Sequence, residues 1–382
     1  MSNLLSKASI VLTPTAYSDG DLHCIKPNTA TGDFDFTRST TATRINSSGN
    51  VESVAANLPR IDYTGGTGQI LLEPQTTNLL TYSEDFSQWS AGSTITLQSG
   101  FSAPDGTNNA YKLTKTGTAQ PYLIFNASLT TSSTRSIFAK TVSGTGTVNL
   151  LNHNSNTNNL FTLTENWQRF DVSTSNSTGV ANFYAVDFRG SSSLSEIIVF
   201  GANATNDQAF ATSYIPTSGS TVTRNADAAN NAGSSSLISG GGSGEGVIYA
   251  EIAAFTSSPG VGNISLSDNN QLRRIVIGFG FSANQILCTI NNGSTFPNFL
   301  SFQTITDVTA YNKIALKYKF NDISLYINGV EVATDTSSTI PTLQSLQFDN
   351  GYNGASQFFG KVKCVAIYKE ALTDAELTCL TT

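Results

Sequence analysis

Charged residues are scarce in this chain of 382 residues and make up only 12% of it. Globular proteins typically carry roughly 25%. Ser, Thr and Asn supply the polarity instead, and 31 glycines are present. Because these residue types suit strands and turns and form helices poorly, the composition indicates an all-β protein of extracellular type. It argues against a cytosolic metabolic enzyme.

Clusters of basic residues are also absent. The chain has 20 Lys and Arg against 27 Asp and Glu, a net charge of −7, and no run of five or more basic residues. Binding of nucleic acid requires clustered cations that neutralise phosphates, so we expect no nucleic-acid partner. The acidic excess is spread along the chain, and we interpret it as a contribution to solubility.

No apolar run is long enough for a membrane span or a secretion signal. A spanning helix needs about 20 apolar residues, and the core of a signal peptide needs about 7–15. The apolar run near the N-terminus, Ala8–Leu12, is shorter than either. We therefore expect neither membrane insertion nor a secretion signal. An extracellular composition without a signal fits release by host lysis.

Cysteine and histidine are too few to indicate a disulfide scaffold, a zinc site or a His-based triad. His23 and His153 lie in separate segments, and neither has a motif around it, whereas those sites need partners at defined geometry. The four cysteines lack CxxC spacing and are sparser than in disulfide-rich secreted domains. We expect free thiols, with a Cys364–Cys379 bond as the alternative. The cysteines are Cys24, Cys288, Cys364 and Cys379.

Short alternating runs separated by Ser, Gly and Asn predict β-sandwiches. We divide the chain into an N-terminal arm and hairpin (1–75), a sandwich of carbohydrate-binding-module type (76–232), a Gly/Ser linker or loop (233–246) and a second sandwich (247–382). The expected fold class is therefore all-β, with two β-sandwich (jelly-roll) domains after an extended arm and a hairpin.

Local signals mark several boundaries in this division. Asn46–Asn50 and Asn328-Gly329 contain residues that tolerate positive φ and predict hairpin turns. The glycine-rich run 233–246 does not fit a phosphate-binding loop, because the strand-like Val247–Ile252 follows it where a helix would be needed. Thr373 and Glu376 predict a capping box at the start of a short C-terminal helix.

Three patterns near the C-terminus occur in a familiar order. Ser324–Val332 contains Leu-Tyr-Ile-Asn-Gly, Phe359–Val362 reads Phe-Gly-Lys-Val, and Leu372–Leu377 reads Leu-Thr-Asp-Ala-Glu-Leu. Their order and spacing resemble the laminin-G-like, concanavalin A-like lectin/glucanase fold over residues 247–382. The resemblance implies that fold and leaves the ligand open.

A second pattern runs through residues 34–228. It comprises Phe36–Asn46, Leu58–Tyr63, Leu71–Leu80, Tyr82–Trp89, Ser213–Thr217 and Val222–Asp227. This arrangement resembles a module of tailed-phage structural proteins that precedes carbohydrate-binding-like or lectin-like domains. The resemblance implies a virion location and does not distinguish head, tail fibre and baseplate.

The residues for glycoside hydrolysis are missing. Laminarinase-like enzymes of the concanavalin A-like fold carry Glu-x-Asp-x-x-Glu on one strand, and its period of two places the carboxylates on one face. This chain has no Glu-x-Asp, and Ala253 stands at the Asp position of the nearest context, Glu251–Phe255. The adjacent Glu84 and Asp85 would face opposite sides of a strand, and we expect them to start a turn. No catalytic residues are predicted.

Sugar binding uses aromatic faces together with planar polar groups. We predict glycan contacts at three aromatic residues of the first sandwich and at a polar loop of the second. Asp268 and Asn269 are weaker candidates for calcium ligands, and no other cofactor is expected. The glycan candidates are Trp89, Tyr122, Tyr184, Tyr352, Asn353 and Asp349.

Together these features predict a virion surface protein of fibre, decoration or tail-associated type, assembled in the host cytoplasm. The N-terminal arm would contact other virion proteins, and the lectin-like domain would bind host or environmental glycans. We expect a homo-oligomer, with a trimer favoured by analogy with fibres, and avidity would strengthen weak sites. The alternatives are a purely structural capsid or baseplate cement and a polysaccharide depolymerase with a non-standard site.

Overall fold

The computed structural model describes residues 2–125, 127, 129–130, 132–153, 159–175, 183–239, 244–270 and 272–382. Strands take up 47% of the chain and helices 6%, which confirms the all-β fold class. The chain forms two compact units. Unit 1 comprises Met1–Ser39, Ala55–Pro74 and Ala226–Thr382, and unit 2 comprises Thr40–Val54 and Gln75–Asn225.

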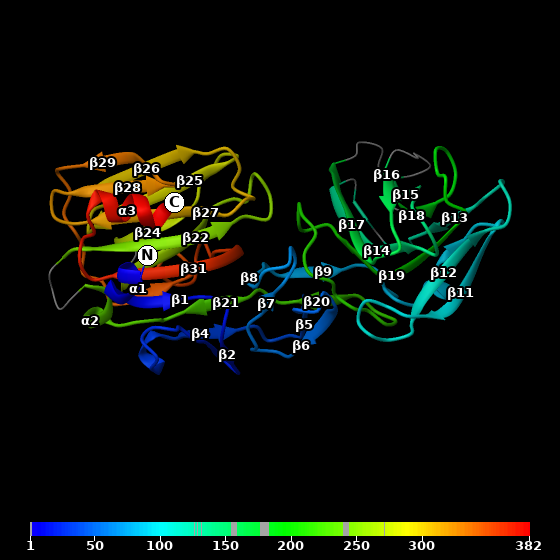
Figure 1. Cartoon of the computed structure of the whole chain (residues 1–382), viewed down its shortest axis with the longest axis horizontal. Coiled ribbons are helices and arrows are strands. Elements are labelled where there is room, and N and C mark those ends of the chain that lie inside the picture. The colour runs from blue at the N-terminus through cyan, green and yellow to red at the C-terminus, as the bar shows by residue number, and fades with distance from the viewer. Residues whose placement is uncertain are drawn as a thin grey trace. The chain divides into compact units, whose positions relative to one another are not determined.

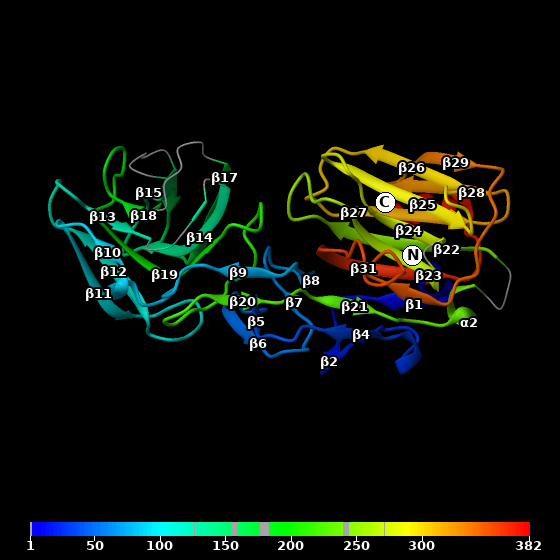
Figure 2. The same cartoon turned by 180° about the vertical axis from the view of Figure 1, so that it is seen from behind.

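Unit 1 is a sandwich of two large sheets that share one apolar core (Figures 1 and 2). The first sheet has the order β29-β28-β27-β22-β31-β8-β7, with β1 also paired to β31, and the second has the order β26-β25-β24-β23-β30. Ile248 and Leu316 of the first sheet and Ile277 of the second are fully buried in the shared core. The strands of the first sheet are β1 (Ala8–Leu12), β7 (Ile61–Asp62), β8 (Gln69–Leu72), β22 (Gly246–Ala253), β27 (Asn312–Tyr318), β28 (Ile323–Ile327), β29 (Val330–Asp335) and β31 (Gly360–Tyr368). Those of the second are β23 (Gly262–Asn270), β24 (Arg273–Phe279), β25 (Gln285–Asn292), β26 (Phe299–Thr304) and β30 (Ser345–Gln347).

Smaller elements complete unit 1. They are β2 (Tyr17–Ser18), β3 (Asp21–Leu22), β4 (Phe34–Thr37) and β21 (Ala228–Asn230), which form one sheet, together with η1 (Ala30–Gly32), α1 (Ser2–Lys7), α2 (Ser235–Ile238) and α3 (Asp374–Thr381). The predicted capping box at Thr373 and Glu376 is present at the start of α3. Within the expected 233–246 linker, α2 buries Ile238, and residues 240–243 lie outside the described residues.

The N-terminal segment differs from the extended arm that was expected. All five residues of β1 are buried, and β1 pairs antiparallel with the C-terminal half of β31, as Figure 1 shows by the blue strand beside the red one. β8 pairs with the N-terminal residues of β31, Gly360–Val362. A short continuous apolar run suits a strand that is covered on both faces. The first residues of the chain are therefore part of the sandwich of unit 1.

Four charged side chains are buried together in unit 1, with at most 2% of any side chain exposed. Arg38 Nη1 donates to Asp227 Oδ1 at 2.9 Å, and Arg60 Nη1 donates to Glu73 Oε2 at 2.6 Å. Arg60 Nη2 also donates to Asp227 Oδ2. Burial lowers the pKa of Arg60, but the two carboxylates outweigh it and the pKa is raised. The buried charge cluster, as we call these four residues, joins segments from four parts of the pattern that resembles the phage module.

Unit 2 is a second sandwich with its own core of apolar side chains. Its sheets have the orders β10-β13-β18-β15-β16 and β11-β12-β19-β14-β17. The strands are β10 (Ser90–Ala91), β11 (Ile95–Phe101), β12 (Ala110–Lys115), β13 (Tyr122–Ile124), β14 (Ser132–Thr141), β15 (Gly146–His153), β16 (Leu160–Leu163), β17 (Gln168–Ser175), β18 (Phe183–Asp187) and β19 (Glu196–Thr205).

Two strand pairs and a short 3-10 helix accompany this sandwich. In the hairpin of β5 (Ala42–Ile45) and β6 (Val51–Val54), Ile45 pairs with Val51. The predicted turn at Asn46–Asn50 is thereby confirmed. β9 (Thr76–Asn78) pairs with β20 (Val222–Arg224), and η2 (Phe86–Gln88) follows β9 along the chain.

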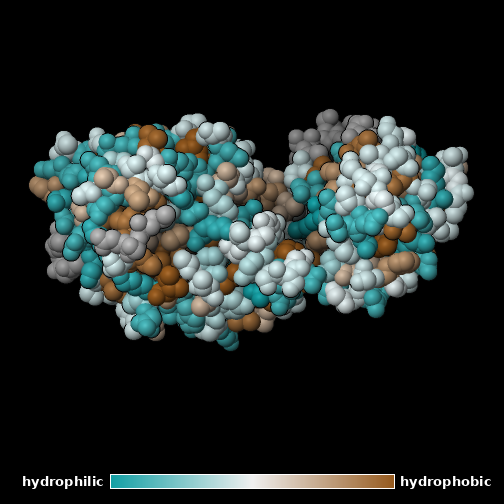
Figure 3. Space-filling model, in the orientation of Figure 1, coloured by the Kyte–Doolittle hydropathy of each residue, from teal (hydrophilic) through white to brown (hydrophobic). Residues whose placement is uncertain are grey.

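Two further expectations concern the cysteines and membrane-spanning helices. All four cysteines are free thiols. Among the helices that the structure describes, none has the length and apolarity to span a bilayer. The face seen in Figure 3 carries its hydrophobic residues in scattered groups among hydrophilic ones.

Candidate functional site

The loop Asp349–Gly354 of unit 1 presents two of the predicted glycan contacts to solvent. Tyr352 is 41% exposed, and the adjacent Asn353 is exposed with a φ of +50°. Gly351 N donates to Asp349 Oδ1 at 2.6 Å, and Tyr352 N donates to Asn350 Oδ1 at 3.0 Å. Hydrogen bonds inside the loop therefore fix the backbone at the aromatic tip.

Gly351 anchors the loop on strand β23. Its φ is +77°, and a Cβ at this position would lie 2.6 Å from the Cβ of Ser267. Ser267 Oγ donates to Gly351 O at 2.9 Å. Only glycine combines this backbone conformation with so close an approach. The loop is therefore held in one position on the sheet.

Asp349 does not face solvent as was expected, because it is only 2% exposed. Burial raises the pKa of its carboxyl group, although the hydrogen bond from Gly351 and the Arg274 guanidinium lower it. Its role is to hold the loop, and the prediction of a direct sugar contact was wrong in this respect.

Three buried polar atoms on β23 and β24 have no hydrogen-bond partner among the residues that the structure describes. They are Asn263 Oδ1, Ser265 Oγ and Arg274 Nε. Arg274 Nη1 donates to Asn350 O at 2.9 Å, so its guanidinium lies against the loop. Buried polar atoms without partners are uncommon in folded proteins and mark places where water or a ligand supplies the missing bonds.

The two candidate calcium ligands are engaged with neighbouring side chains. Asp268 Oδ2 accepts hydrogen bonds from Arg273 at 3.1 Å and Thr342 at 2.9 Å, and Asn269 Oδ1 accepts from Gln347 at 2.9 Å. The described part of the chain contains no group of three or more His, Cys, Asp or Glu that could hold a metal ion. These bonds hold Asp268 and Asn269 at the connection between β23 and β24, and calcium binding there stays a prediction.

Trp89 is a core residue and not the surface aromatic that was predicted. It is 8% exposed, and its ring lies edge-on to Phe86 and Phe125, with centroids 4.8 and 4.6 Å away. Its Nε1 donates to Tyr82 O at 2.7 Å. Neither face is open to stack on a sugar ring, because the tryptophan fills the sandwich.

The other two aromatic candidates of unit 2 have different positions. Tyr122 of β13 is half-buried, and the Arg189 guanidinium covers its ring at 4.7 Å from the centroid. Tyr184 belongs to β18, and its side chain lies outside the described residues. Of the predicted aromatic residues of unit 2, Trp89 is thus in the core and Tyr122 is covered by Arg189.

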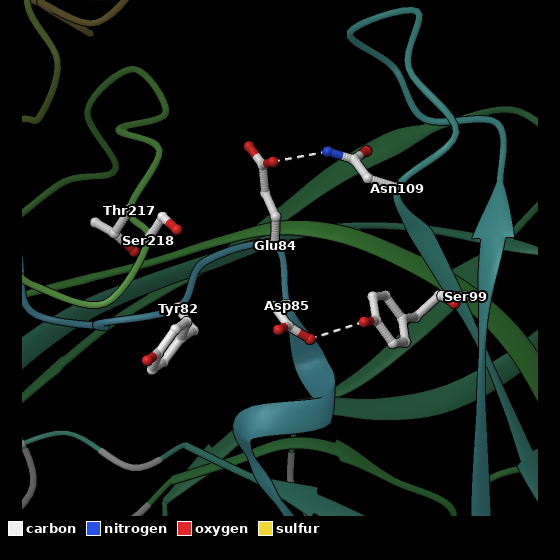
Figure 4. A pocket seen from close by; sticks show the side chains of 8 residues that line it. Tyr82, Glu84, Asp85, Ser99, Asn109, Thr217 and Ser218 are labelled. Atoms are coloured by element: carbon white, nitrogen blue, oxygen red, sulfur yellow. Dashed lines mark hydrogen bonds between the residues drawn. The ribbon is translucent and has the colours of Figure 1, made fainter.

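A hollow of about 290 Å³ in unit 2 was not foreseen from the sequence (Figure 4). Figure 4 shows Glu84 turned toward Asn109 and Asp85 turned elsewhere, with Thr217 and Ser218 on another segment. The only signal in the sequence was that Tyr82–Trp89 and Ser213–Thr217 belong to one pattern. The lining residues are Tyr82, Glu84, Asp85, Ser99, Asn109, Tyr111, Thr217 and Ser218.

The two carboxylates of this hollow have different environments. Glu84 accepts from Asn109 Nδ2 at 2.7 Å and from Tyr214 OH at 2.8 Å. Burial raises the pKa of Glu84 despite the hydrogen bond from Tyr214, and the charge of Asp105 adds to the rise. Asp85 caps η2, as expected of a residue that starts a turn. Hydrogen bonds from Ser87 and Tyr111 lower the pKa of Asp85.

The raised pKa of Glu84 predicts a pH-dependent stability of unit 2. The ordinary pKa of Glu is 4.5, and a higher value in the folded state means that the proton is bound more tightly there. This contribution is fully present below pH 4.5 and is lost as the pH rises through the folded pKa. Gln does not titrate, so Glu84→Gln does not lose this contribution. We therefore expect the Tm of Glu84→Gln relative to that of the parent protein to be higher at about pH 7 than at about pH 4. Both tryptophans lie in unit 2, so their fluorescence monitors this unit, and a difference in Tm that does not change with pH would contradict the prediction.

Comparison with known proteins gives one family match. Residues 251–378 match the model Laminin_G_3, described as the concanavalin A-like lectin/glucanases superfamily. This match confirms the lectin-like resemblance for the C-terminal part of unit 1, which is a concanavalin A-like domain. No curated protein matches the chain.

Three of the solved structures that match this chain each cover 36% of it. One is a leech intramolecular trans-sialidase complexed with 2,7-anhydro-Neu5Ac, at 21% identity and a TM-score of 0.30, of which the matched region spans 23%. Another is the CBM40 of a Ruminococcus gnavus IT-sialidase bound to alpha2,3 sialyllactose, at 19% identity and a TM-score of 0.30. The match covers 83% of that chain. A third is a heptameric SAP-like pentraxin from Limulus polyphemus, at 12% identity and a TM-score of 0.30. The match covers 70% of that chain.

Proposed function

We propose that this chain is a non-catalytic protein of a virion surface whose lectin-like domain binds host or environmental glycans. The observation that carries the proposal is the exposed Tyr352 and Asn353 at the tip of a loop fixed on a concanavalin A-like sandwich. Because Gly351 and Asp349 already hold the loop in place, little conformational freedom is lost when a ligand binds.

The chemistry of the loop fits a sugar. The Tyr352 ring offers an apolar face for the CH side of a pyranose, and the Asn353 amide offers a donor and an acceptor for hydroxyl groups. Arg274, which contacts the loop through Asn350 O, carries a donor at Nε that has no partner among the described residues. An aromatic platform with a few polar groups beside it is the usual composition of such sites.

The virion part of the proposal is supported by the resemblance of residues 34–228 to a phage structural module. Arg38, Arg60, Glu73 and Asp227 all belong to that pattern, and they form the buried charge cluster. Residues of the pattern that resembles the phage module thus contribute to the buried interior of unit 1. Since β1 is buried in unit 1, contacts with other virion proteins, and the trimer that we favour, would use the surface of the folded units and not a free arm.

Binding of the purified full-length chain to an array of bacterial surface and environmental polysaccharides tests the proposal. We expect Tyr352→Ala to reduce binding at least about tenfold, the effect of losing one stacking aromatic at a small site. Phe320→Ala is the matched control, because Phe320 is a 64% exposed aromatic that follows β27 of the opposite sheet. Its binding should equal that of the parent chain.

Three outcomes would contradict the proposal. Absence of binding to every glycan, together with particles that lose stability when the protein is missing, would identify a cement protein. Release of reducing ends from a polysaccharide would identify a depolymerase. Failure of antibodies against the chain to label purified virions would remove the virion location.

A further inference from the structure

We propose that the hollow of unit 2 is a second carbohydrate site, which accepts one uncharged pyranose unit. This site lies outside the lectin-like match at residues 251–378, so it stands independently of the glycan contact at Tyr352. Ligand pockets usually measure roughly 300–1,000 Å³, and a hollow of about 290 Å³ lies just below the lower limit of that range. Its size therefore suits a single sugar ring and not a long segment of chain.

The side chains around the hollow are of the types that bind sugars. Tyr82 and Tyr111 supply partly buried aromatic rings, and Ser99 and Ser218 supply exposed hydroxyl groups. Asn109 supplies an amide, which can donate and accept. The remaining polar lining consists of the carboxylates of Glu84 and Asp85 and the hydroxyl of Thr217.

The carboxylates keep capacity for further donors. An ionised carboxylate has about four acceptor positions. Glu84 uses one at each oxygen, for Asn109 and Tyr214. Asp85 receives its short bonds at Oδ1, whereas the one bond to Oδ2 from the described residues comes from Gln88 at 3.4 Å. Sugar hydroxyls that donate to Glu84 and Asp85 Oδ2 would occupy the free positions with charge-assisted hydrogen bonds.

A chain of hydrogen bonds holds this arrangement in place before a ligand arrives. The Tyr214 hydroxyl contacts Ser83 Oγ at 2.6 Å and Glu84 at 2.8 Å, and Tyr111 OH donates to Asp85 Oδ1 at 2.7 Å. A purely structural role would be to hold residues 213–217 against residues 82–84. The buried hydrogen bonds of Ser83, Tyr214 and Thr217 are sufficient for that role. This structural role does not explain why Asp85, Asn109 and Tyr111 line an open hollow. A role in ligand binding explains it.

The charge of the hollow selects the class of sugar. Two carboxylates and no Lys or Arg are among the lining residues, and the charge of Asp105 is close enough to act on Glu84. A sialic or uronic acid would place its carboxylate against these groups, and like charges at close range disfavour binding strongly. An uncharged hexose or N-acetylhexosamine meets no such repulsion.

Titration of the full-length protein with monosaccharides tests the inference. The probes are glucose, galactose, mannose and N-acetylglucosamine, with glucuronate and N-acetylneuraminate as acidic counterparts. Tryptophan fluorescence is a suitable readout, because both tryptophans are in unit 2 and Trp89 Nε1 bonds to the backbone of Tyr82. We expect saturable binding of at least one uncharged sugar, and binding of neither acidic sugar at the same concentration.

Variants of neighbouring asparagines separate binding from folding. Asn109→Ala should weaken the binding about tenfold, whereas Asn108→Ala, at the exposed adjacent position outside the hollow, should leave it unchanged at equal Tm. Tyr352→Ala should also leave it unchanged, which distinguishes this site from the proposed site in unit 1. The inference is overturned if no uncharged sugar binds, if the acidic sugars bind equally well, if Asn109→Ala has no effect, or if Ca²⁺ alone produces the fluorescence change.

Discussion

Replacement of Asp227 by Ala is expected to destabilise unit 1 by about 3–5 kcal/mol, the usual cost of removing one partner from a buried ion pair. Asp227 accepts from both Arg38 and Arg60, and all three side chains are fully buried. Glu73 N also donates to Asp227 Oδ2 at 2.8 Å. Without Asp227, Glu73 is the one carboxylate left in the buried charge cluster, and the two guanidinium groups stay buried.

The distribution of cysteine makes this loss measurable in unit 1 alone. All four cysteines lie in unit 1, and Cys24 and Cys288 are buried with their thiol pKa values raised by that burial. The thiolate is the reactive form, so labelling of these two residues requires unit 1 to open. In Asp227→Ala they should label at much lower urea concentration, while tryptophan fluorescence of unit 2 changes little.

Asp19→Ala is the matched control, because Asp19 is an exposed aspartate of the same unit. A change within about 0.5 kcal/mol is expected for such a surface position. If Asp227→Ala labelled at the same urea concentration as the control, the buried charge cluster would not be a stabilising part of unit 1.

Local patterns in the sequence were sufficient to predict strands and turns. Asn328-Gly329 between β28 and β29 has φ values of +50° and +84°, as the Asn-Gly signal indicated. The capping box at Thr373 was equally accessible, because all of its atoms lie within one turn of helix. Such signals depend only on residues that are neighbours in the chain.

Pairing between distant segments could not be predicted in this way. Ala8–Leu12 was interpreted as an arm because its partner strand, β31, begins at Gly360. The partners of Arg38 and Arg60 include Asp227, which lies 189 and 167 positions away along the chain. No local period or turn signal encodes such separations, and charged residues are rarely expected in a core.

The candidate sites show the same division. The exposure of Tyr352 could be predicted because Asp, Asn and Gly around an aromatic indicate an exposed turn. Asp349 was misplaced, because a carboxylate that accepts a loop N–H looks identical in sequence to one that faces solvent. The hollow of unit 2 joins residues of Tyr82–Asp85, Ser99–Tyr111 and Thr217–Ser218, and only the folded sandwich brings these three segments together.

Replacement of Trp89 by Ala should destabilise unit 2 by about 3–5 kcal/mol, because a large core side chain leaves a cavity when it is truncated. The loss includes the contacts with Phe86 and Phe125 and the hydrogen bond to Tyr82 O. Trp89→Phe keeps an aromatic ring and should cost about 1–2 kcal/mol. Urea unfolding followed by the fluorescence of Trp167, which then is the remaining tryptophan, measures both values.

Trp167→Ala is the matched comparison for this core position. Trp167 is only partly buried, and Lys140 Nζ lies 5.4 Å from the centroid of its ring, so its truncation should cost clearly less than that of Trp89. If Trp89→Ala kept the stability of unit 2 and abolished the binding of a sugar, the original interpretation of Trp89 as a glycan contact would be restored. The packing of Trp89 against Phe86 and Phe125 predicts a different result. We expect Trp89→Ala to lower the stability of unit 2, and any loss of sugar binding in the hollow to follow from the disturbed core.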